Sequence, residues 1–418
     1  MYRRDLLVRT GLLLGAGLLA AAPSPALGSE TTTTDDWGAL RDQFELSRDW
    51  IHMGGLYLAS HPAPVREAIE RHRRGLDENP VHYLQERGPR LEAAVLRAAA
   101  DYLGGAPTDI ALTDSTTMGL GLLYDGLAVR ADQELLTSAH DFASTHESLR
   151  VKAARSGAAL RQVQLYDDPA AASEDAIVET LRAAVTPRTR VVALTWVHSS
   201  SGVKLPIRRI ADALAELNRG RDDGDRALLC VDGVHGLGVE EAAAASLGCD
   251  FFVAGCHKWL FGPRGTGLVW GAPRAWAQAS PTIPTFSDPR VPGRLHTPGG
   301  FHSFEHRWAL AEAFGLHLAI GRDRAAARIR ELAGQLKEGL AALPRVRLYT
   351  PLDPALSAGL VCFDLRGLAP RAVVARLREH GIVATTTPYA TSYARLAPGL
   401  LNSPEEVETT LAAVRALA

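Results

Sequence analysis

Short apolar runs that alternate with helical segments are the feature that most limits how this chain can fold. Runs of this kind predict strands that are covered on both faces. Helical stretches such as 180–185 and 207–219 separate them. The pattern predicts βαβ units and an α/β domain with a mostly parallel sheet. The five runs are Ile110–Thr113, Glu134–Thr137, Val191–Thr195, Leu228–Val231 and Phe251–Ala254. A further strand, Gly267–Trp270, is expected to return beside the Phe251 strand.

The sequence changes in character after Gly299, where long Ala-, Leu- and Arg-rich helices begin. A Ser403 N-cap, with Glu405 and Glu406 in the first turn, predicts the start of a closing helix. We therefore expect a large domain over 63–299 and a smaller α/β domain over 300–418, which residues 37–62 join from the N-terminal side. The elements expected in the small domain are helices at 304–343, 371–380 and 404–418, and strands at 359–365 and 382–386.

The N-terminus has the pattern of an export signal. Arg3 and Arg4 precede an apolar run over 10–22 that is too short to span a membrane, and small residues at 26–28 suit a cleavage site. The paired arginines resemble a twin-arginine signal, although Tyr2 and Val8 depart from its usual pattern. We predict a signal peptide over 1–28, a disordered tether over 29–36 and a location outside the cytoplasm. The alternative is a frayed leader on a cytoplasmic enzyme.

Composition limits the partners of this chain. It has 45 Lys and Arg against 47 Asp and Glu, so its formal charge of −2 gives no net field for nucleic acid or an anionic membrane. No apolar run after the N-terminus is long enough to span a membrane. Four cysteines without a C-x-x-C pair indicate neither a disulfide framework nor a zinc site. The pairs His140/His146 and His302/His306 lack a third ligand, so no metal is expected, and a small-molecule enzyme is the favoured class.

Two residues at predicted strand ends suggest the chemistry. Ligands of open α/β sheets bind beyond the carboxyl ends of the strands. Lys258 stands where a strand opens into the glycine-rich turn 262–267, and burial there would lower its pKa and make it a nucleophile toward carbonyls. Asp232 follows another strand and could pair with a pyridinium nitrogen. Taken singly, such a lysine is usually solvent-facing and such an aspartate is usually a cap.

Together these motifs resemble the class V aminotransferases, which are pyridoxal-phosphate enzymes of fold type I. Asp232-Gly233-Val234-His235 and Gly255-Cys256-His257-Lys258-Trp259 carry the resemblance, which covers nearly the whole chain after the leader. Three segments resemble the isopenicillin N epimerase-like branch: the residues around Lys258, residues 300–307 and Asn79-Pro80. The resemblance implies a large domain with a seven-stranded-type sheet flanked by helices, a small C-terminal domain and a homodimer.

The resemblance also implies roles for individual residues. Lys258 would form the imine with the cofactor and Asp232 would keep the ring nitrogen protonated. Ser115, Thr116, Thr117 and His257 would hold the phosphate, Phe142 would stack on the ring, and Ser199 and His235 would lie near the phenolic oxygen. Thr297 would give a phosphate contact to the neighbouring subunit, and Arg395 would bind the substrate carboxylate. The sequence departs from the family pattern at two positions. Gly255 stands where several relatives have Ser, and Ala397 replaces the Ser of the family's arginine motif.

The implied function is a reaction at the α-carbon of an amino acid, either transamination or epimerisation. Elimination from the β-carbon with release of sulfide or a thiol is the alternative, and a non-catalytic protein that binds the cofactor is a weaker one. Persulfide transfer is disfavoured, because residues 384–393 contain no cysteine and Cys362 lies in a predicted strand. Cys256 is expected to pack rather than to act as a redox switch. The sequence does not identify the substrate.

Overall fold

The computed structural model describes residues 37–418, and Leu40–Ala418 form one compact unit. The predicted signal peptide and tether, residues 1–36, lie outside the described residues. No helix within 37–418 combines the length and the apolar character that crossing a membrane requires.

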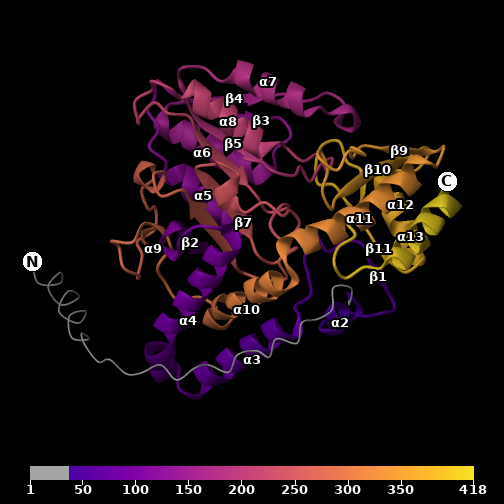
Figure 1. Cartoon of the computed structure of the whole chain (residues 1–418), viewed down its shortest axis with the longest axis horizontal. Helices are drawn as coiled ribbons and strands as arrows, with labels where there is room; N and C mark the ends of the chain where they lie inside the picture. Colours follow the sequence, from indigo (N-terminus) through magenta and orange to yellow (C-terminus); the bar gives the residue numbers. More distant parts are fainter. Residues whose placement is uncertain (1–36) are drawn as a thin grey trace, which may run out of the picture. The chain divides into compact units, whose positions relative to one another are not determined.

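A seven-stranded sheet forms the centre of the larger part of this unit (Figure 1). Among the described residues its strand order is β2-β8-β7-β6-β5-β3-β4, and β8 alone runs antiparallel to its neighbours. The prediction of a mostly parallel sheet, with a strand that returns beside the Phe251 strand, is confirmed. The strands are β2 (Ile110–Thr113), β3 (Glu134–Ser138), β4 (Ala159–Val163), β5 (Thr189–Thr195), β6 (Leu228–Asp232), β7 (Phe251–Gly255) and β8 (Gly267–Gly271).

Burial explains why most of these strands were visible in the sequence. Every residue of β2, β3, β5, β6, β7 and β8 is buried, so apolar side chains are needed on both faces. The edge strand β4 has the polar sequence Ala-Leu-Arg-Gln-Val and is partly exposed, and it was not predicted. The helices associated with this sheet are α5 (Thr116–Gly126), α6 (Ala143–Ser156), α7 (Glu174–Ala184) and α8 (Ile207–Leu217). Short helical turns lie at η1 (Pro107–Asp109), η2 (Pro169–Ala171), η3 (Ala244–Ser246), η4 (Trp276–Gln278) and α9 (Pro292–Leu295).

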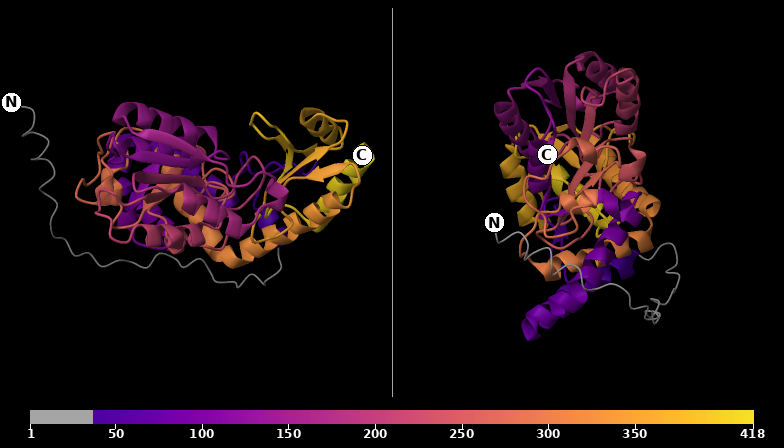
Figure 2. Two further views of the ribbon diagram at one scale, coloured as in Figure 1. Left: turned by 90° about the horizontal axis from the view of Figure 1, so that it is seen from above. Right: turned by 90° about the vertical axis from the view of Figure 1, so that its left-hand side faces the viewer.

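The C-terminal part contains a four-stranded antiparallel sheet in the order β12-β13-β10-β9. Figure 2 shows this part in orange to yellow. The helix α13 begins with the predicted Ser403 cap, where Ser403 and Glu406 form a reciprocal capping box. The predicted strand 382–386 is two strands, since β11 pairs with β1 and β12 pairs with β13. The elements are α10 (Phe304–Ile320), α11 (Arg322–Ala341), β9 (Val346–Leu348), β10 (Val361–Leu365), α12 (Pro370–Glu379), β11 (Ile382–Val383), β12 (Thr385–Thr386), β13 (Ala394–Leu396) and α13 (Pro404–Leu417).

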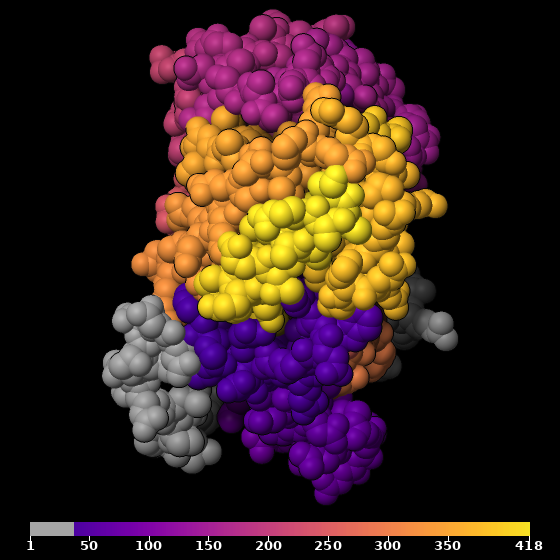
Figure 3. Space-filling model, turned by 90° about the vertical axis from the view of Figure 1, so that its right-hand side faces the viewer, coloured from indigo at the N-terminus to yellow at the C-terminus, as the bar shows by residue number. Residues whose placement is uncertain are grey.

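Within the unit Leu40–Ala418, residues 40–62 pack beside the C-terminal elements, as Figure 3 shows for the indigo and yellow surfaces. β1 (Ile51–His52) pairs in parallel with β11, and Arg41 pairs with Glu406 of α13 at 2.5 Å. After α2 (Trp37–Asp42) and β1, the helices α3 (Ala63–Glu78) and α4 (Pro80–Leu103) pack on α10. α10 belongs to the predicted small domain, and α3 and α4 belong to the predicted large one. The domain boundaries at 62/63 and 299/300 stay a prediction.

Candidate active site

One cavity lies at the carboxyl ends of β6 and β7 and is closed by the N-terminus of α5 and by β13. Its unfilled space, including the part open to solvent, is about 710 Å³. Ten of the eleven predicted site residues line it. The lining residues are Leu56, Tyr57, Ser115, Thr116, Thr117, Phe142, Ser144, Thr195, Ser199, Asp232, Val234, His235, His257, Lys258, Pro388 and Arg395.

Lys258 enters the cavity three residues after the end of β7. Burial lowers the pKa of Lys258 to about 8, an effect that Arg395 strengthens and Asp232 opposes. Within residues 37–418, no hydrogen bond or ion pair to the Lys258 Nζ is observed. A buried amine that is partly neutral near pH 8 and free of such contacts suits attack on a carbonyl carbon.

The turn after Lys258 leaves no room for a side chain at Gly262. The Gly262 N–H donates to the Cys256 carbonyl at 2.8 Å, which folds the chain back beneath the lysine. A Cβ at position 262 would lie 2.8 Å from that oxygen and 2.9 Å from the Cys256 Cβ, so a side chain does not fit. Phe261 takes a positive φ of 60° in the same turn, a conformation that is uncommon for a residue other than glycine. The lysine is therefore presented by a tightly constrained turn.

Asp232 is the last residue of β6 and is buried. Its Oδ1 accepts a hydrogen bond from the Val234 N–H at 3.1 Å. Burial raises the pKa of Asp232 to about 6, while that hydrogen bond and the Lys258 charge act in the opposite direction. No ion pair within 4.0 Å involves this carboxylate in the described part of the chain. A buried carboxylate with so few partners suits a cationic ring nitrogen.

The N-terminus of the eleven-residue helix α5 supplies hydroxyl groups to the same cavity. Ser115 is the N-cap and accepts from the Met118 N–H at 3.1 Å, and the Thr117 and Ser144 hydroxyls lie 3.1 Å apart. The Thr116 Oγ1 accepts from the Gly255 N–H at 2.7 Å. Helix N-termini with adjacent hydroxyls favour anions, so this end of the cavity suits a phosphate group.

Gly255 fits this packing without a side chain. A Cβ built there would lie 3.0 Å from the Thr116 Oγ1 and 3.0 Å from the His257 Cε1. A serine at this position would press on both residues. The missing hydroxyl at 255 therefore accompanies a close approach of Thr116 to the strand end.

The strand β13 contributes the predicted carboxylate ligand to the cavity. Arg395, buried in β13, donates from Nη1 to the Ser199 carbonyl at 2.8 Å and from Nε to the Thr385 Oγ1 at 3.1 Å. Burial lowers the pKa of Arg395. Phe142, the N-cap residue of α6, meets the Tyr389 ring edge to face at 6.0 Å. The two domains predicted from sequence thus both contribute to this site.

Two histidines complete the cavity wall. The Trp259 indole N–H donates to the His235 Nδ1 at 3.3 Å, and the His257 carbonyl accepts from the Ala59 N–H at 3.0 Å. Burial is the main cause that lowers the pKa of both histidines, and the Lys258 charge adds to it. Both rings are therefore neutral at physiological pH. Their predicted cofactor contacts stay a prediction.

Thr297 is the one predicted site residue that the structure does not bring into this cavity. Its hydroxyl accepts from the Leu112 N–H at 3.0 Å and donates to the Gly293 carbonyl at 3.2 Å, and the side chain is buried. The hydroxyl is therefore used to fix the chain after α9 to β2. A phosphate contact to a neighbouring subunit stays a prediction.

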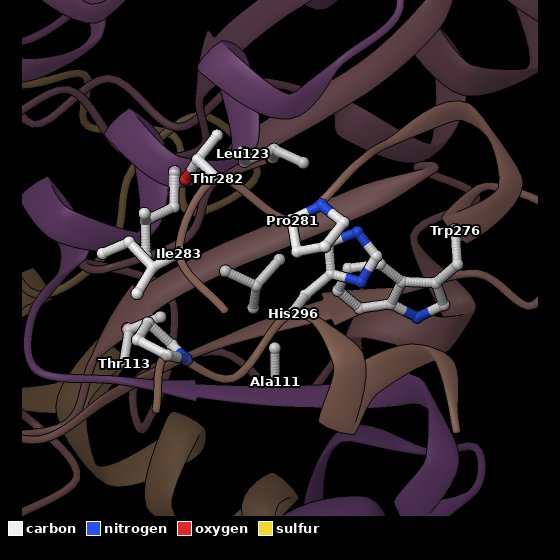
Figure 4. Close-up of a pocket in the computed structure, with 11 residues that line it drawn as sticks. Ala111, Thr113, Leu123, Trp276, Pro281, Thr282, Ile283 and His296 are labelled. Carbon is white, nitrogen blue, oxygen red and sulfur yellow. The ribbon is translucent and has the colours of Figure 1, made fainter. Parts of the chain in front are cut away.

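A second, apolar pocket lies near Thr297 (Figure 4). Its lining includes Ala111, Leu123 and Ile283, and the His296 and Trp276 rings lie 4.5 Å apart beside it. No lysine, arginine or carboxylate lines this pocket. It therefore lacks the groups for the chemistry predicted from the sequence.

Several residues around the site were not predicted. Asp141 accepts from the Thr137 hydroxyl at 2.7 Å and from the Thr195 N–H at 2.5 Å, which fixes the ends of β3 and β5 together. The His198 Nδ1 lies 2.7 Å from the Tyr166 hydroxyl, and the His140 ring stacks on Tyr166 at 3.8 Å. Asp141 and His198 follow the carboxyl ends of β3 and β5, where ligands of such sheets bind, but Tyr166 carries no signal of its own. The unpredicted lining residues are Leu56, Tyr57, Ser144, Thr195, Val234 and Pro388.

The histidine pairs do not form metal sites. Across residues 37–418 no three His, Cys, Asp or Glu side chains are grouped so that they could hold an ion. His140 stacks on Tyr166, and the His306 Nδ1 lies 3.0 Å from the Arg264 carbonyl.

Known proteins resemble this chain over most of its length. The family profile described as "Aminotransferase class-V" matches residues 59–396. Isopenicillin N epimerase of Streptomyces clavuligerus is 27% identical over 346 residues, which cover 79% of this chain and 84% of that protein. A probable cysteine desulfurase of Pseudomonas aeruginosa is 32% identical over 227 residues, 53% of each chain.

Solved structures show the same fold. The cystine C–S lyase C-DES in complex with cysteine persulfide has a TM-score of 0.79 at 22% identity, covering 87% of this chain and 97% of that one. The apo cysteine desulfurase of Thermococcus onnurineus has a TM-score of 0.78 at 21% identity, with 96% and 99% covered. The predictions of fold type I and of pyridoxal phosphate as cofactor are confirmed. The chain is a pyridoxal-phosphate-dependent enzyme that belongs to the class V aminotransferase family.

Proposed function

We propose that this enzyme acts at the α-carbon of an amino acid, by transamination or epimerisation. The observation that carries the proposal is that Lys258, Asp232 and Arg395, from three different strands or strand ends, line one cavity. A lysine, a carboxylate and an arginine supply a proton-transfer group, a ring-nitrogen partner and a carboxylate ligand. The isopenicillin N epimerase relatives support epimerisation as one of the two reactions.

The lining residues include groups for both the phosphate and the ring nitrogen of the cofactor. Ser115, Thr116 and Thr117 at the α5 N-terminus would hold its phosphate, and Asp232 would hold its ring nitrogen. When bound, pyridoxal phosphate supplies an electron sink for the negative charge that forms at the substrate α-carbon. The buried Asp232 carboxylate would keep the ring nitrogen protonated, since among the described residues it accepts a hydrogen bond only from the Val234 N–H.

The remaining steps belong to Lys258 and Arg395. The Arg395 guanidinium binds the substrate carboxylate, and its bonds to the Ser199 carbonyl and the Thr385 hydroxyl fix its orientation. A Lys258 amine with a pKa of about 8 can take the α-proton as a neutral base and return it as an ammonium. Return of the proton by Lys258 to the face from which it was taken preserves the configuration, so epimerisation needs a donor on the opposite face and transamination needs the proton delivered away from the α-carbon.

The proposal is tested by hydrogen exchange and product analysis. The holoenzyme is incubated in heavy water with a panel of amino acids, and loss of the α-proton is followed by NMR. We expect exchange with at least one amino acid, abolished in Lys258→Ala and retained in Lys152→Ala, because Lys152 lies outside the cavity. A keto acid would identify transamination and the opposite enantiomer epimerisation. Normal cofactor binding without exchange from any amino acid would instead indicate the non-catalytic alternative.

Carbon–sulfur β-elimination is the second candidate. The four cysteines of the described chain are buried, and burial raises the pKa of the Cys256 and Cys362 thiols to about 12. A protonated, buried thiol is a poor nucleophile toward sulfur, which disfavours transfer of a persulfide to this protein. Elimination needs only the lysine, the cofactor and a held carboxylate, so it remains open. Pyruvate with sulfide or a thiol among the products would favour the lyase.

We also propose that the chain forms a homodimer. Phe286 and Phe301, which flank Thr297 in sequence, are 77% and 84% exposed. Large aromatic side chains exposed in this way are typical of an interaction surface. Light scattering should give twice the 44.8 kDa of the chain, and a monomer at all concentrations would contradict the proposal.

Export by the twin-arginine route is a further proposal. It is supported by Arg3, Arg4 and the apolar run that follows them. Replacing both arginines by lysine should retain the precursor in the cytoplasm. Equal export of both forms would indicate another route or a leader without this role.

A further inference from the structure

The loop between β12 and β13 is closed at its base. The Thr387 N–H donates to the Tyr393 carbonyl at 3.0 Å, and the Tyr393 N–H donates to the Thr387 Oγ1 at 2.9 Å. The Ser392 hydroxyl donates to the Thr387 carbonyl at 2.7 Å. The Tyr393 ring stacks on Tyr349 at 3.8 Å. The loop therefore presents its remaining side chains, including Tyr389, from a fixed frame.

Tyr389 contacts two lining residues of the active-site cavity. Its hydroxyl lies 2.7 Å from the Ser199 Oγ, and its ring meets the Phe142 ring at 6.0 Å and 74°. Burial raises the pKa of Tyr389 well above its usual value, so the phenol stays protonated. A phenol is a stronger acid than a serine hydroxyl, which favours donation from Tyr389 to Ser199. A serine oxygen that accepts this bond keeps its own proton for another acceptor.

Ser199 also connects this pair to the carboxylate ligand. Its carbonyl accepts from the Arg395 Nη1 at 2.8 Å, while its hydroxyl faces Tyr389 and the cavity. Serial hydrogen bonds polarise one another, so the bond from Tyr389 should strengthen a bond that Ser199 donates. The hydroxyl of Tyr389 can thus affect the cavity without lining it.

We propose that Tyr389 is a positioning residue, whose hydroxyl fixes Ser199 so that the serine proton points into the cavity toward the phenolic oxygen of the cofactor. The inference rests on the proposed function, since it takes Ser199 to face that oxygen. Tyr389 acts through Ser199 and touches no reacting atom. Its effect should therefore vanish when the Ser199 hydroxyl is absent.

A double-mutant cycle on cofactor binding tests this directly. Apoenzymes of wild type, Tyr389→Phe, Ser199→Ala and the double variant are titrated with pyridoxal phosphate, and the dissociation constant is measured by protein fluorescence. Loss of one hydrogen bond corresponds to about 2- to 10-fold weaker binding. We expect that loss for Tyr389→Phe in the wild-type background and no further loss in Ser199→Ala.

Tyr393→Phe is the matched control, because it removes a hydroxyl from the same loop that forms no hydrogen bond within residues 37–418. It should leave the dissociation constant unchanged. Tyr389→Phe should also move the pH midpoint of the cofactor's visible absorption band, and Tyr393→Phe should not. Circular dichroism melts of all variants establish that the compared proteins are folded.

Independent effects of the Tyr389 and Ser199 substitutions would overturn the inference. Equal behaviour of Tyr389→Phe and Tyr393→Phe would overturn it as well. In either case a wild type that binds the cofactor and exchanges the substrate α-proton would leave the proposed function intact. A wild type that binds the cofactor without catalysing exchange would remove the proposed function alone, because the cycle measures binding.

Discussion

Lys258 should destabilise the apoenzyme, and its replacement by methionine should make the fold more stable. Burial lowers the pKa of Lys258 to about 8 from its ordinary 10.5, so the ammonium is less favourable in the folded protein than in the unfolded one. Each tenfold change in proton affinity corresponds to about 1.4 kcal/mol, which gives a cost of about 3 kcal/mol at pH 7. This cost already includes the favourable Asp232 interaction, and imperfect packing of the methionine side chain reduces the gain in Lys258→Met, so we expect about 1 to 3 kcal/mol.

The pH dependence separates charge from packing. Below pH 8 the lysine is protonated in both states and the full cost applies. Between pH 8 and 10.5 the unfolded chain binds a proton that the folded protein has released, so wild-type stability rises with pH. Urea unfolding of both apoenzymes from pH 6 to 10.5 should show a gap that is widest at low pH and closes near 10.5.

Lys337 provides the matched comparison. Burial also lowers the pKa of Lys337 to about 8, but its ammonium donates to the Pro351 and Leu352 carbonyls at 2.9 Å and to the Ser357 hydroxyl at 2.6 Å. Lys337→Met should nevertheless destabilise the protein by about 1 to 3 kcal/mol, because the loss of these three hydrogen bonds outweighs the relief of the buried charge. If Lys258→Met were as destabilising as Lys337→Met, or its gap did not depend on pH, the reasoning would be refuted.

Three further substitutions or treatments have defined outcomes. Asp232→Asn should lower turnover by orders of magnitude with cofactor still bound, as steady-state kinetics and absorption spectra would show; near-normal turnover would make Asp232 only a cap. Gly255→Ser should cost about 1 to 3 kcal/mol in urea unfolding, because its Cβ presses on Thr116 and His257, whereas unchanged stability would contradict that crowding. Incubation with L-cysteine should leave no protein-bound persulfide. A persulfide on Cys362, found by mass spectrometry, would overturn the argument against persulfide transfer.

The sequence predicted the central sheet well because its strands are buried on both faces. β7, at 251–255, is entirely apolar or glycine, and it ends three residues before the lysine it positions. The edge strand β4 was missed because none of its residues is fully buried, so it tolerates Arg161 and Gln162. The two-residue strands β1 and β11 are too short for any periodicity to show, and pairing between distant segments alone defines them.

The residues of the site also divide into those that the sequence predicted and those that it did not. The sequence predicted Lys258, Asp232 and the α5 N-terminus because ligands bind beyond the carboxyl ends of the strands, and local sequence shows where a strand ends. Tyr389 contacts Ser199, and Leu56 lines the same cavity as Lys258, although both belong to segments far in sequence from the central strands, so only the folded chain shows these neighbours. Thr297 is marked by the family motif, and its hydroxyl forms two hydrogen bonds within the fold, while its contact to a neighbouring subunit stays a prediction.

The most direct test of the central claim is the position of the covalent bond to the cofactor. The holoenzyme is reduced with borohydride and digested, and the modified peptide is sequenced by mass spectrometry. We predict a single pyridoxyl group on the Nζ of Lys258, and none in reduced Lys258→Ala. A pyridoxyl group on another lysine of the wild type, or a reducible linkage that persists in Lys258→Ala, would contradict the assignment of this cavity as the active site.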